Sequence, residues 1–188
     1  MKKVVKFGGS SLASAEQFMK VGAIIRADES RRYVVPSAPG KRFSDDTKVT
    51  DMLYHCYELA EQSKAFNKQL NQIKDRYNEI INGLKLDFSL DEDFEIIKKQ
   101  FVAKAGSMYA ASRGEYLNGK IMAKYLGYEF VDAANVIRFD KDGSFDSETT
   151  NELLATYLDK IERAVIPGFY GAMKNGTVVT FSRGGSDI

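Results

Sequence analysis

The sequence predicts an α/β domain, a three-layer αβα sandwich whose sheet is mainly parallel. Short runs of β-branched and aromatic residues alternate with stretches that carry apolar residues at helical spacing, a pattern typical of strands joined by helical crossovers. Several of the strand-like runs end at glycine-rich turns. The last such turn comes at the end of the 188 residues with no helical pattern after it, so the domain is expected to be truncated.

The composition narrows the class of ligand. The 27 Lys and Arg residues balance 26 Asp and Glu residues, which does not favour nucleic acid or a membrane surface, so an anionic ligand must be held by local groups. No apolar run is long enough to span a membrane, and we expect a cytoplasmic protein. Cys56 is the only cysteine, which excludes an internal disulfide and a cysteine-based metal site. We expect it to be a buried thiol beside the only histidine, His55.

The first 47 residues predict a strand, a helix and a second strand. The first strand contains Val4, Val5 and Phe7, the helix covers 13–27, and the second strand covers 31–36. The apolar face of the helix is formed by Phe18, Val21, Ile24 and Ile25. A right-handed crossover of this kind implies a parallel pair of strands. The polar segment 41–47 predicts a mobile surface loop that could act as a substrate lid.

The rest of the chain predicts one domain with a helical insertion. The pattern is helical from residue 48 to about residue 105, and a further helix is expected over 111–127. The remaining expected elements are strands over 128–132 and 136–139 with a small-residue turn between them, a helix over 148–161, a strand over 164–171 broken by its glycine-flanked aromatic pair, and a last strand over 177–181. The buried stripe of the 148–161 helix is expected to be Leu153, Leu154, Tyr157 and Leu158.

The stretch that ends the first strand is suited to bind a phosphate. Gly8 and Gly9 lack the Cβ atoms that would keep an anion away from the main-chain N–H groups. Ser10 or Ser11 can cap a following helix, whose N-terminus attracts negative charge. Lys6 lies two residues before the first glycine and can neutralise a phosphate oxygen. The same residues also make an ordinary strand-to-helix turn, and that alternative stays open at this point.

Four turns of this kind follow predicted strands, and ligands of open α/β sheets gather at that edge. They are Lys6-Phe7-Gly8-Gly9-Ser10, Ser37-Ala38-Pro39-Gly40, Gly168-Phe169-Tyr170-Gly171 and Arg183-Gly184-Gly185-Ser186-Asp187. Two of the four are flanked by a cation, which indicates phosphate handling. The sequence has neither the Walker pattern nor the Gly-x-Gly-x-x-Gly dinucleotide fingerprint, so a phosphate site of another kind is predicted.

These turns, together with Ser112-Arg113-Gly114-Glu115, resemble in order the motifs of the aspartate kinases, and the match extends over the whole chain. The resemblance implies the amino acid kinase fold and transfer of the γ-phosphoryl group of ATP, with Mg2+, to the β-carboxylate of L-aspartate. It also implies a step of lysine, threonine and methionine biosynthesis, and a homo-oligomeric full-length protein. The nucleotide-binding half and the regulatory domains are expected to follow the last motif, so the 188 residues alone are expected to be inactive.

The resemblance also assigns roles to residues. It implies that Lys6 contacts the transferring phosphoryl group, with Asp187 holding Lys6 or a magnesium-bound water. Glu115 would pair with the α-ammonium of the substrate, and Arg183 would bind a substrate carboxylate. Further substrate contacts are implied for Thr50, Ser37 and Ser186. Phosphate contacts are implied for the residues Phe7, Gly8, Gly9, Ser10, Gly184 and Gly185.

Simpler interpretations of these residues remain. Glu115 and Arg113 could form a solvated pair on a helix, and Thr50 could cap the helix that begins beside it. Phe169 and Tyr170 are more readily explained as core residues than as rings that stack on a ligand. Asp45, Asp46 and Asp51 are expected to be loop charges, and no protein metal site is predicted. Two other functions stay open: an amino acid kinase for glutamate or acetylglutamate, and a non-catalytic module that binds an amino acid.

Overall fold

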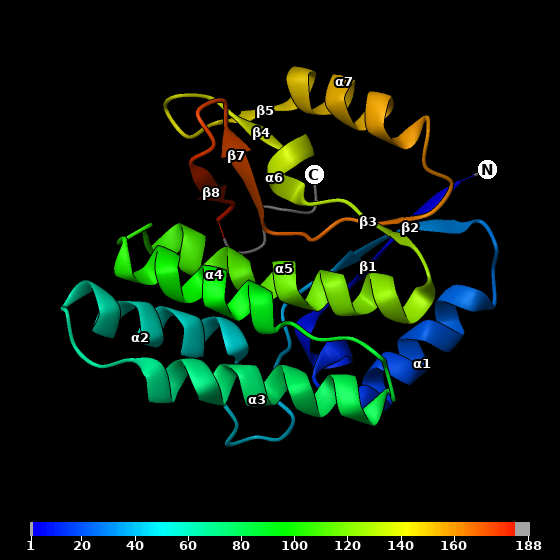
Figure 1. Ribbon diagram of the computed structural model, residues 1–188. Helices are drawn as coiled ribbons and strands as arrows, with labels where there is room; N and C mark the ends of the chain where they lie inside the picture. Colours follow the sequence, from blue (N-terminus) through cyan, green and yellow to red (C-terminus); the bar gives the residue numbers. More distant parts are fainter. Residues whose placement is uncertain (1, 183–188) are drawn as a thin grey trace.

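A parallel sheet organises the protein, whose computed structural model describes residues 2–182 (Figure 1). Its strands are β1 (Lys3–Phe7), β2 (Arg31–Pro36), β6 (Ala164–Val165) and β3 (Glu129–Phe130), side by side in that order. All three neighbouring pairs are parallel, and Val5 lies beside Val34 and Phe7 beside Pro36. The carboxyl ends of β1 and β2 therefore lie together, as the sequence predicts.

A second, mixed sheet was not predicted from the sequence. It consists of β5 (Phe145–Asp146), β4 (Arg138–Phe139), β7 (Tyr170–Met173) and β8 (Val178–Thr180), in that order. The pair β4 and β7 is parallel, and both outer pairs are antiparallel. The break expected at the aromatic pair within 164–171 is confirmed, since the chain turns at Phe169, whose φ is 74°. The two parts, β6 and β7, belong to different sheets, which was not expected.

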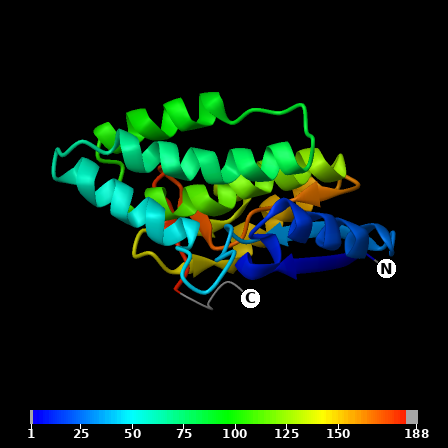
Figure 2. The same ribbon diagram turned by 90° about the horizontal axis from the view of Figure 1, so that it is seen from below.

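Helices cover one side of the parallel sheet in two tiers, as Figures 1 and 2 show. They are α1 (Ala15–Arg26), α2 (Val49–Glu61), α3 (Asn67–Gly83), α4 (Asp91–Val102) and α5 (Ser107–Leu126). The longest, α5, lies against the sheet and is almost wholly buried through its middle. One apolar cluster joins these helices to Val34 and Val165 of the sheet, so the region 49–102 shares the main core of the domain.

The opposite side carries a thinner layer, which completes the αβα arrangement (Figure 1). Helix α7 (Ser147–Leu158) lies there together with the short helix α6 (Ala133–Val136). The turn expected before residue 136 is thus a helical turn, capped by the Asp132 side chain, which accepts the N–H of Ala134. Between residues 2 and 182 no helix is long and apolar enough to cross a membrane.

Two predicted buried faces need correction. Ile24 is exposed because the core side of α1 runs through Phe18, Gly22 and Ile25, where the missing side chain of Gly22 admits the ring of Tyr125. Tyr157 is also exposed, because α7 packs inward through Leu154 and Leu158, against a cluster that includes Tyr33 and Ile166. Leu153, Leu154 and Leu158 are half-buried there.

Helix α4 offers a matched test of the helical core. Phe101 is fully buried between the rings of Tyr57 and Phe66, whereas its neighbour Val102 is 66% exposed. We predict that Phe101→Ala lowers the free energy of unfolding by about 3–5 kcal/mol, because it leaves a cavity, while Val102→Ala changes it by less than about 0.5 kcal/mol. Urea unfolding measures both values. Equal losses for the two variants would contradict this packing.

Candidate functional site

The site begins where two glycine turns meet backbone to backbone. Beyond β1 and β2, the N–H of Ser37 donates to the carbonyl of Phe7 at 3.0 Å, and the N–H of Gly40 donates to the carbonyl of Gly9 at 2.8 Å. A Cβ atom on Gly9 would lie 2.8 Å from the Ala38 carbonyl oxygen, and one on Gly40 would lie 2.7 Å from the Gly9 carbonyl carbon. Glycine is therefore required at both positions by the close approach of the two turns.

The helix cap expected at Ser10 or Ser11 is wrong. Both residues lie in a 3-10 turn, η1 (Gly9–Leu12), which is closed by the N–H of Ser11 donating to the Gly8 carbonyl at 3.0 Å. This extra turn displaces the start of α1, and Ser14 caps the helix by accepting the N–H of Gln17. The hydroxyl of Ser10 is therefore not used as a helix cap, and Ser10 lines a cavity beside the turn.

A buried carboxylate faces the glycine turns from α5. Glu115 is only 6% exposed, and its side chain accepts a hydrogen bond from the backbone N–H of Ala38. Its Oε2 atom is buried without a hydrogen-bond partner in the described part of the chain. Helix α5 comes this close because Gly114 has no side chain, and a Cβ atom there would lie 2.8 Å from the Ala38 Cβ atom.

Burial sets the charge state of this carboxylate. It raises the pKa of Glu115 to about 7, against the opposing effects of the Ala38 hydrogen bond and of the Arg113 charge. An unpaired carboxylate oxygen in such a place is costly, and a cationic hydrogen-bond donor would compensate for it. The alternative of a solvated pair is wrong, since Arg113 is buried as well.

Arg113 is surrounded by aromatic rings. Its guanidinium lies 4.3 Å from the ring centroid of Tyr116, 4.7 Å from that of Tyr109 and 5.4 Å from that of Tyr170. Tyr170 is fully buried and donates to Asp132 at 2.7 Å, which supports its interpretation as a core residue. Arg113 thus packs α5 against β7 and does not face the glycine turns as a free charge.

Asn118 is a site residue that sequence reasoning missed. Its Nδ2 atom donates to the Ser37 carbonyl at 2.7 Å, so the turn after β2 is fastened to α5. Asn118 follows Glu115 by three residues, which places both side chains on one face of the helix. The three-residue spacing from Glu115 could identify Asn118 from the sequence, but only once the helix and its buried face are known.

The predicted residues line two adjoining cavities of roughly 420 and 460 Å³. Ser37, Lys48, Thr50 and Glu115 line both. The first also contains Lys6, Asp51, Tyr54, Gly168, Phe169, Thr180 and Phe181, and the second contains Gly9, Ser10, Ala38, Pro39, Gly40 and Lys41. Lys48 precedes α2 as its N-cap residue, so the interpretation of Thr50 as the cap is wrong.

Other predicted residues lie elsewhere. Phe7 is half-buried against the main core, and Gly8 is exposed at the start of η1, so neither lines these two cavities. The residues predicted from the last motif, Arg183, Gly184, Gly185, Ser186 and Asp187, lie outside the described residues. Across residues 2–182 no group of three His, Cys, Asp or Glu side chains is gathered as a metal site would need.

Comparison with known proteins decides the family. The sequence matches the amino acid kinase family over residues 1–188. The chain belongs to the amino acid kinase family. It is 37% identical over 200 residues to aspartokinase 3 of Bacillus subtilis, covering 99% of this chain and 44% of that protein. The chloroplastic aspartokinase 1 of Arabidopsis thaliana is 30% identical, with 98% of this chain and 36% of the relative covered.

The fold of this amino acid kinase chain is also that of solved aspartate kinases. The crystal structure of the Clostridium acetobutylicum aspartate kinase superposes with a TM-score of 0.95 at 51% identity, over all of this chain and 43% of that one. The chain therefore spans less than half the length of these relatives. The expected three-layer α/β fold with a mainly parallel sheet is confirmed.

The close approach of the two turns predicts different effects on stability for alanine at two adjacent glycines. Gly9→Ala should lower the free energy of unfolding by about 1–3 kcal/mol, because its methyl group would press on the Ala38 carbonyl. Gly8→Ala should change it by less than about 0.5 kcal/mol, because nothing lies within 4 Å of the added Cβ atom. Chemical denaturation compares the two, and a greater loss for Gly8→Ala would refute the contact.

The raised pKa of Glu115 predicts how stability changes with pH. The folded state holds this proton more tightly than the unfolded state, so the contribution is complete below pH 4.5 and is lost as the pH rises to about 7. We expect the unliganded protein to lose on the order of 3 kcal/mol of unfolding free energy across this range through Glu115. Glu115→Gln should remove this slope, and the exposed control Glu61→Gln should keep it; the same slope in both would contradict the assignment.

Proposed function

We propose that this chain is the amino-acid-binding part of an aspartate kinase catalytic domain. The reaction is transfer of the γ-phosphoryl group of ATP to the β-carboxylate of L-aspartate, in the cytoplasm, as a step of lysine, threonine and methionine biosynthesis. The similarity to aspartokinases of Bacillus subtilis and Clostridium acetobutylicum supports this assignment. Assembly of the full-length protein into a homo-oligomer belongs to the same proposal.

The unpartnered Oε2 atom of Glu115 is the observation that carries the proposal. It is buried between α5 and the Ser37–Gly40 turn, beside two cavities that Ser37 and Thr50 also line. An α-ammonium group would supply the missing donor and the opposite charge. A free amino acid therefore fits this position better than an N-acetylated one, which has no ammonium group.

The chemistry requires little acid–base assistance from the protein. The substrate carboxylate is ionised at neutral pH, so its oxygen can attack the γ-phosphorus while the bond to the β-phosphate oxygen breaks and ADP leaves. Rate enhancement then comes from positioning and from stabilisation of the transferring charge. We assign the stabilisation of the transferring charge to Lys6, which lines the cavity that contains Glu115. We assign to Arg183 and Asp187 the roles that the resemblance implies.

The residues at the first turn fit an anionic phosphate chain. Gly9 and Ser10 line the second cavity, and Gly8 leaves open space beside its Cα atom. Backbone N–H groups, a hydroxyl and the Lys6 ammonium are donors suited to the phosphates of ATP. The Mg2+ that accompanies ATP would supply charge neutralisation, held mainly by the phosphates.

The proposal predicts a specific loss in Glu115→Gln. In the full-length protein, kcat/KM for L-aspartate should fall on the order of 100-fold, because the amide presents its NH2 group where the ammonium would bind. The assay is ATP-dependent formation of aspartyl phosphate, trapped with hydroxylamine. Glu61→Gln, exposed at the end of α2, is the control and should match the wild type.

The same assay separates the competing functions. Glutamate and N-acetylglutamate are offered to the wild-type protein beside aspartate. Faster turnover of either acid would assign another amino acid kinase activity. Aspartate binding by calorimetry with no phosphoryl transfer would instead favour a non-catalytic module.

A further inference from the structure

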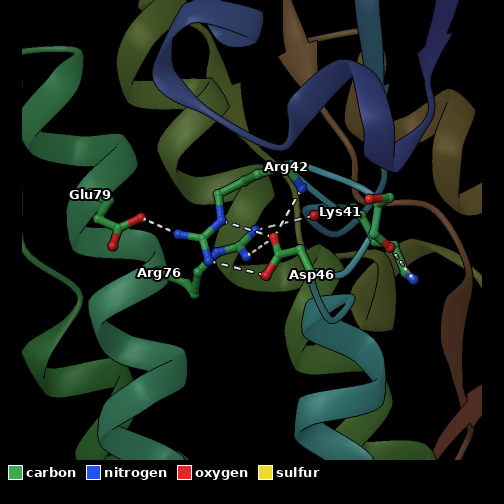
Figure 3. Close-up of polar contacts among 7 residues, drawn as sticks. Lys41, Arg42, Asp46, Arg76 and Glu79 are labelled. Carbon is green, nitrogen blue, oxygen red and sulfur yellow. Dashed lines mark hydrogen bonds and ion pairs between the residues drawn. The ribbon is translucent and has the colours of Figure 1, made fainter.

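A cluster of opposite charges adjoins the Ser37–Gly40 turn, where Arg76 donates to the Gly40 carbonyl. It consists of Arg42, Asp46 and Arg76, and we call it the brace (Figure 3). We infer that Arg76 is a positioning residue, which acts with Asp46 to hold the Ser37–Gly40 turn against the first glycine turn. The effect on turnover rests on the proposed function, whereas the effect on the turn itself does not.

Arg76 donates hydrogen bonds to two residues of the segment that follows β2, Gly40 and Asp46. It lies in α3, is only 4% exposed, and donates from one terminal nitrogen to Asp46 Oδ2 at 2.5 Å and from the other to the Gly40 carbonyl at 3.1 Å. A planar guanidinium can direct two donors to two acceptors, which the single nitrogen of a lysine does less well. The residue type therefore matches the geometry.

Gly40 links Arg76 to the first glycine turn. Its carbonyl accepts from Arg76, and its own N–H donates to the Gly9 carbonyl at 2.8 Å. Gly40 thus connects α3 to the turn that follows β1 through the hydrogen bonds of its own carbonyl and N–H groups. Because the two turns touch without intervening side chains, a shift at Gly40 must be felt at Gly9.

Asp46 is the acidic member of the brace, and both Arg42 and Arg76 bind it. It accepts from the backbone N–H of Arg42 at 2.9 Å and from its side chain at 2.8 and 3.1 Å. These hydrogen bonds hold the pKa of Asp46 well below its usual range, so the carboxylate stays charged at all physiological pH values. The segment expected to be a mobile lid is thus fastened to α3 in this structure, with Lys41 and Lys48 placed at the second cavity.

Glu79, which pairs with Arg42 but is not part of the brace, provides a matched control. Arg42 also donates to Glu79 at 2.7 Å, one turn beyond Arg76 on α3 (Figure 3). Glu79 is mostly exposed and pairs with Arg42, whereas the hydrogen bond to the Gly40 carbonyl comes from Arg76. Exposed ion pairs of this kind contribute little, so its loss should leave the turn in place.

The test uses Arg76→Met, Arg76→Lys and Glu79→Gln in the full-length protein. Amide hydrogen exchange is read at Gly40 and Arg42, whose N–H groups donate to Gly9 and Asp46. We expect exchange at both to rise about tenfold or more in Arg76→Met, to rise less in Arg76→Lys, and to match the wild type in Glu79→Gln. In the aspartate kinase assay, kcat/KM should fall roughly 10- to 100-fold in Arg76→Met through misplacement of the turns.

Each outcome decides one claim. Unchanged exchange at Gly40 in both Arg76 variants would overturn the brace, and faster exchange with unchanged kcat/KM would overturn its positioning role. If Arg76→Met does not fold, Arg76→Lys together with Asp46→Asn decides by the same two readouts. A wild-type protein that transfers no phosphoryl group to aspartate would refute the proposed function alone, because the exchange measurement still tests the brace.

Discussion

The direct backbone contact between the turns that follow β1 and β2 is the constraint on which the site depends. The Gly40 N–H donates to the Gly9 carbonyl, and neither residue has room for a Cβ atom. Other elements converge on this contact: Glu115 and Asn118 reach the second turn from α5, and Arg76 reaches it from α3. The helices after β2 therefore do more than cover the sheet, because Arg76, Glu115 and Asn118 hold the backbone carbonyl and N–H groups of this loop.

The charges around this contact are arranged in two separate ways. Asp46 is fully paired with two arginines and stays ionised. Glu115 keeps one buried oxygen without a partner, and burial raises its pKa. The paired charge contributes rigidity, and the unpaired one stores a desolvation cost that a cationic ligand can relieve. This division fits the function we propose, because the buried carboxylate would be prepared for an ammonium group before the substrate arrives.

The parts of the fold predicted from sequence are those with local signals. β1, β2 and α5 have clear apolar patterns, and the glycine turns were located by residue type alone. The small sheet was missed because a strand such as Phe145–Asp146 is too short to show a period of two. Arg76 and Asn118 were missed because their acceptors, the carbonyls of Gly40 and Ser37, lie 36 and 81 residues away in the chain. Backbone acceptors leave no mark in a sequence, so such contacts require the fold.

The central claim is that the free oxygen of Glu115 receives the α-ammonium of aspartate. Carbon-13 NMR of the labelled Glu115 carboxyl group, titrated with and without L-aspartate, tests it most directly. We predict a pKa of about 7 in the unliganded protein and a fall of more than about one unit when aspartate binds, because an ammonium partner favours the ionised form. A pKa that stays the same while aspartate demonstrably binds would contradict the pairing of Glu115 with the ammonium group.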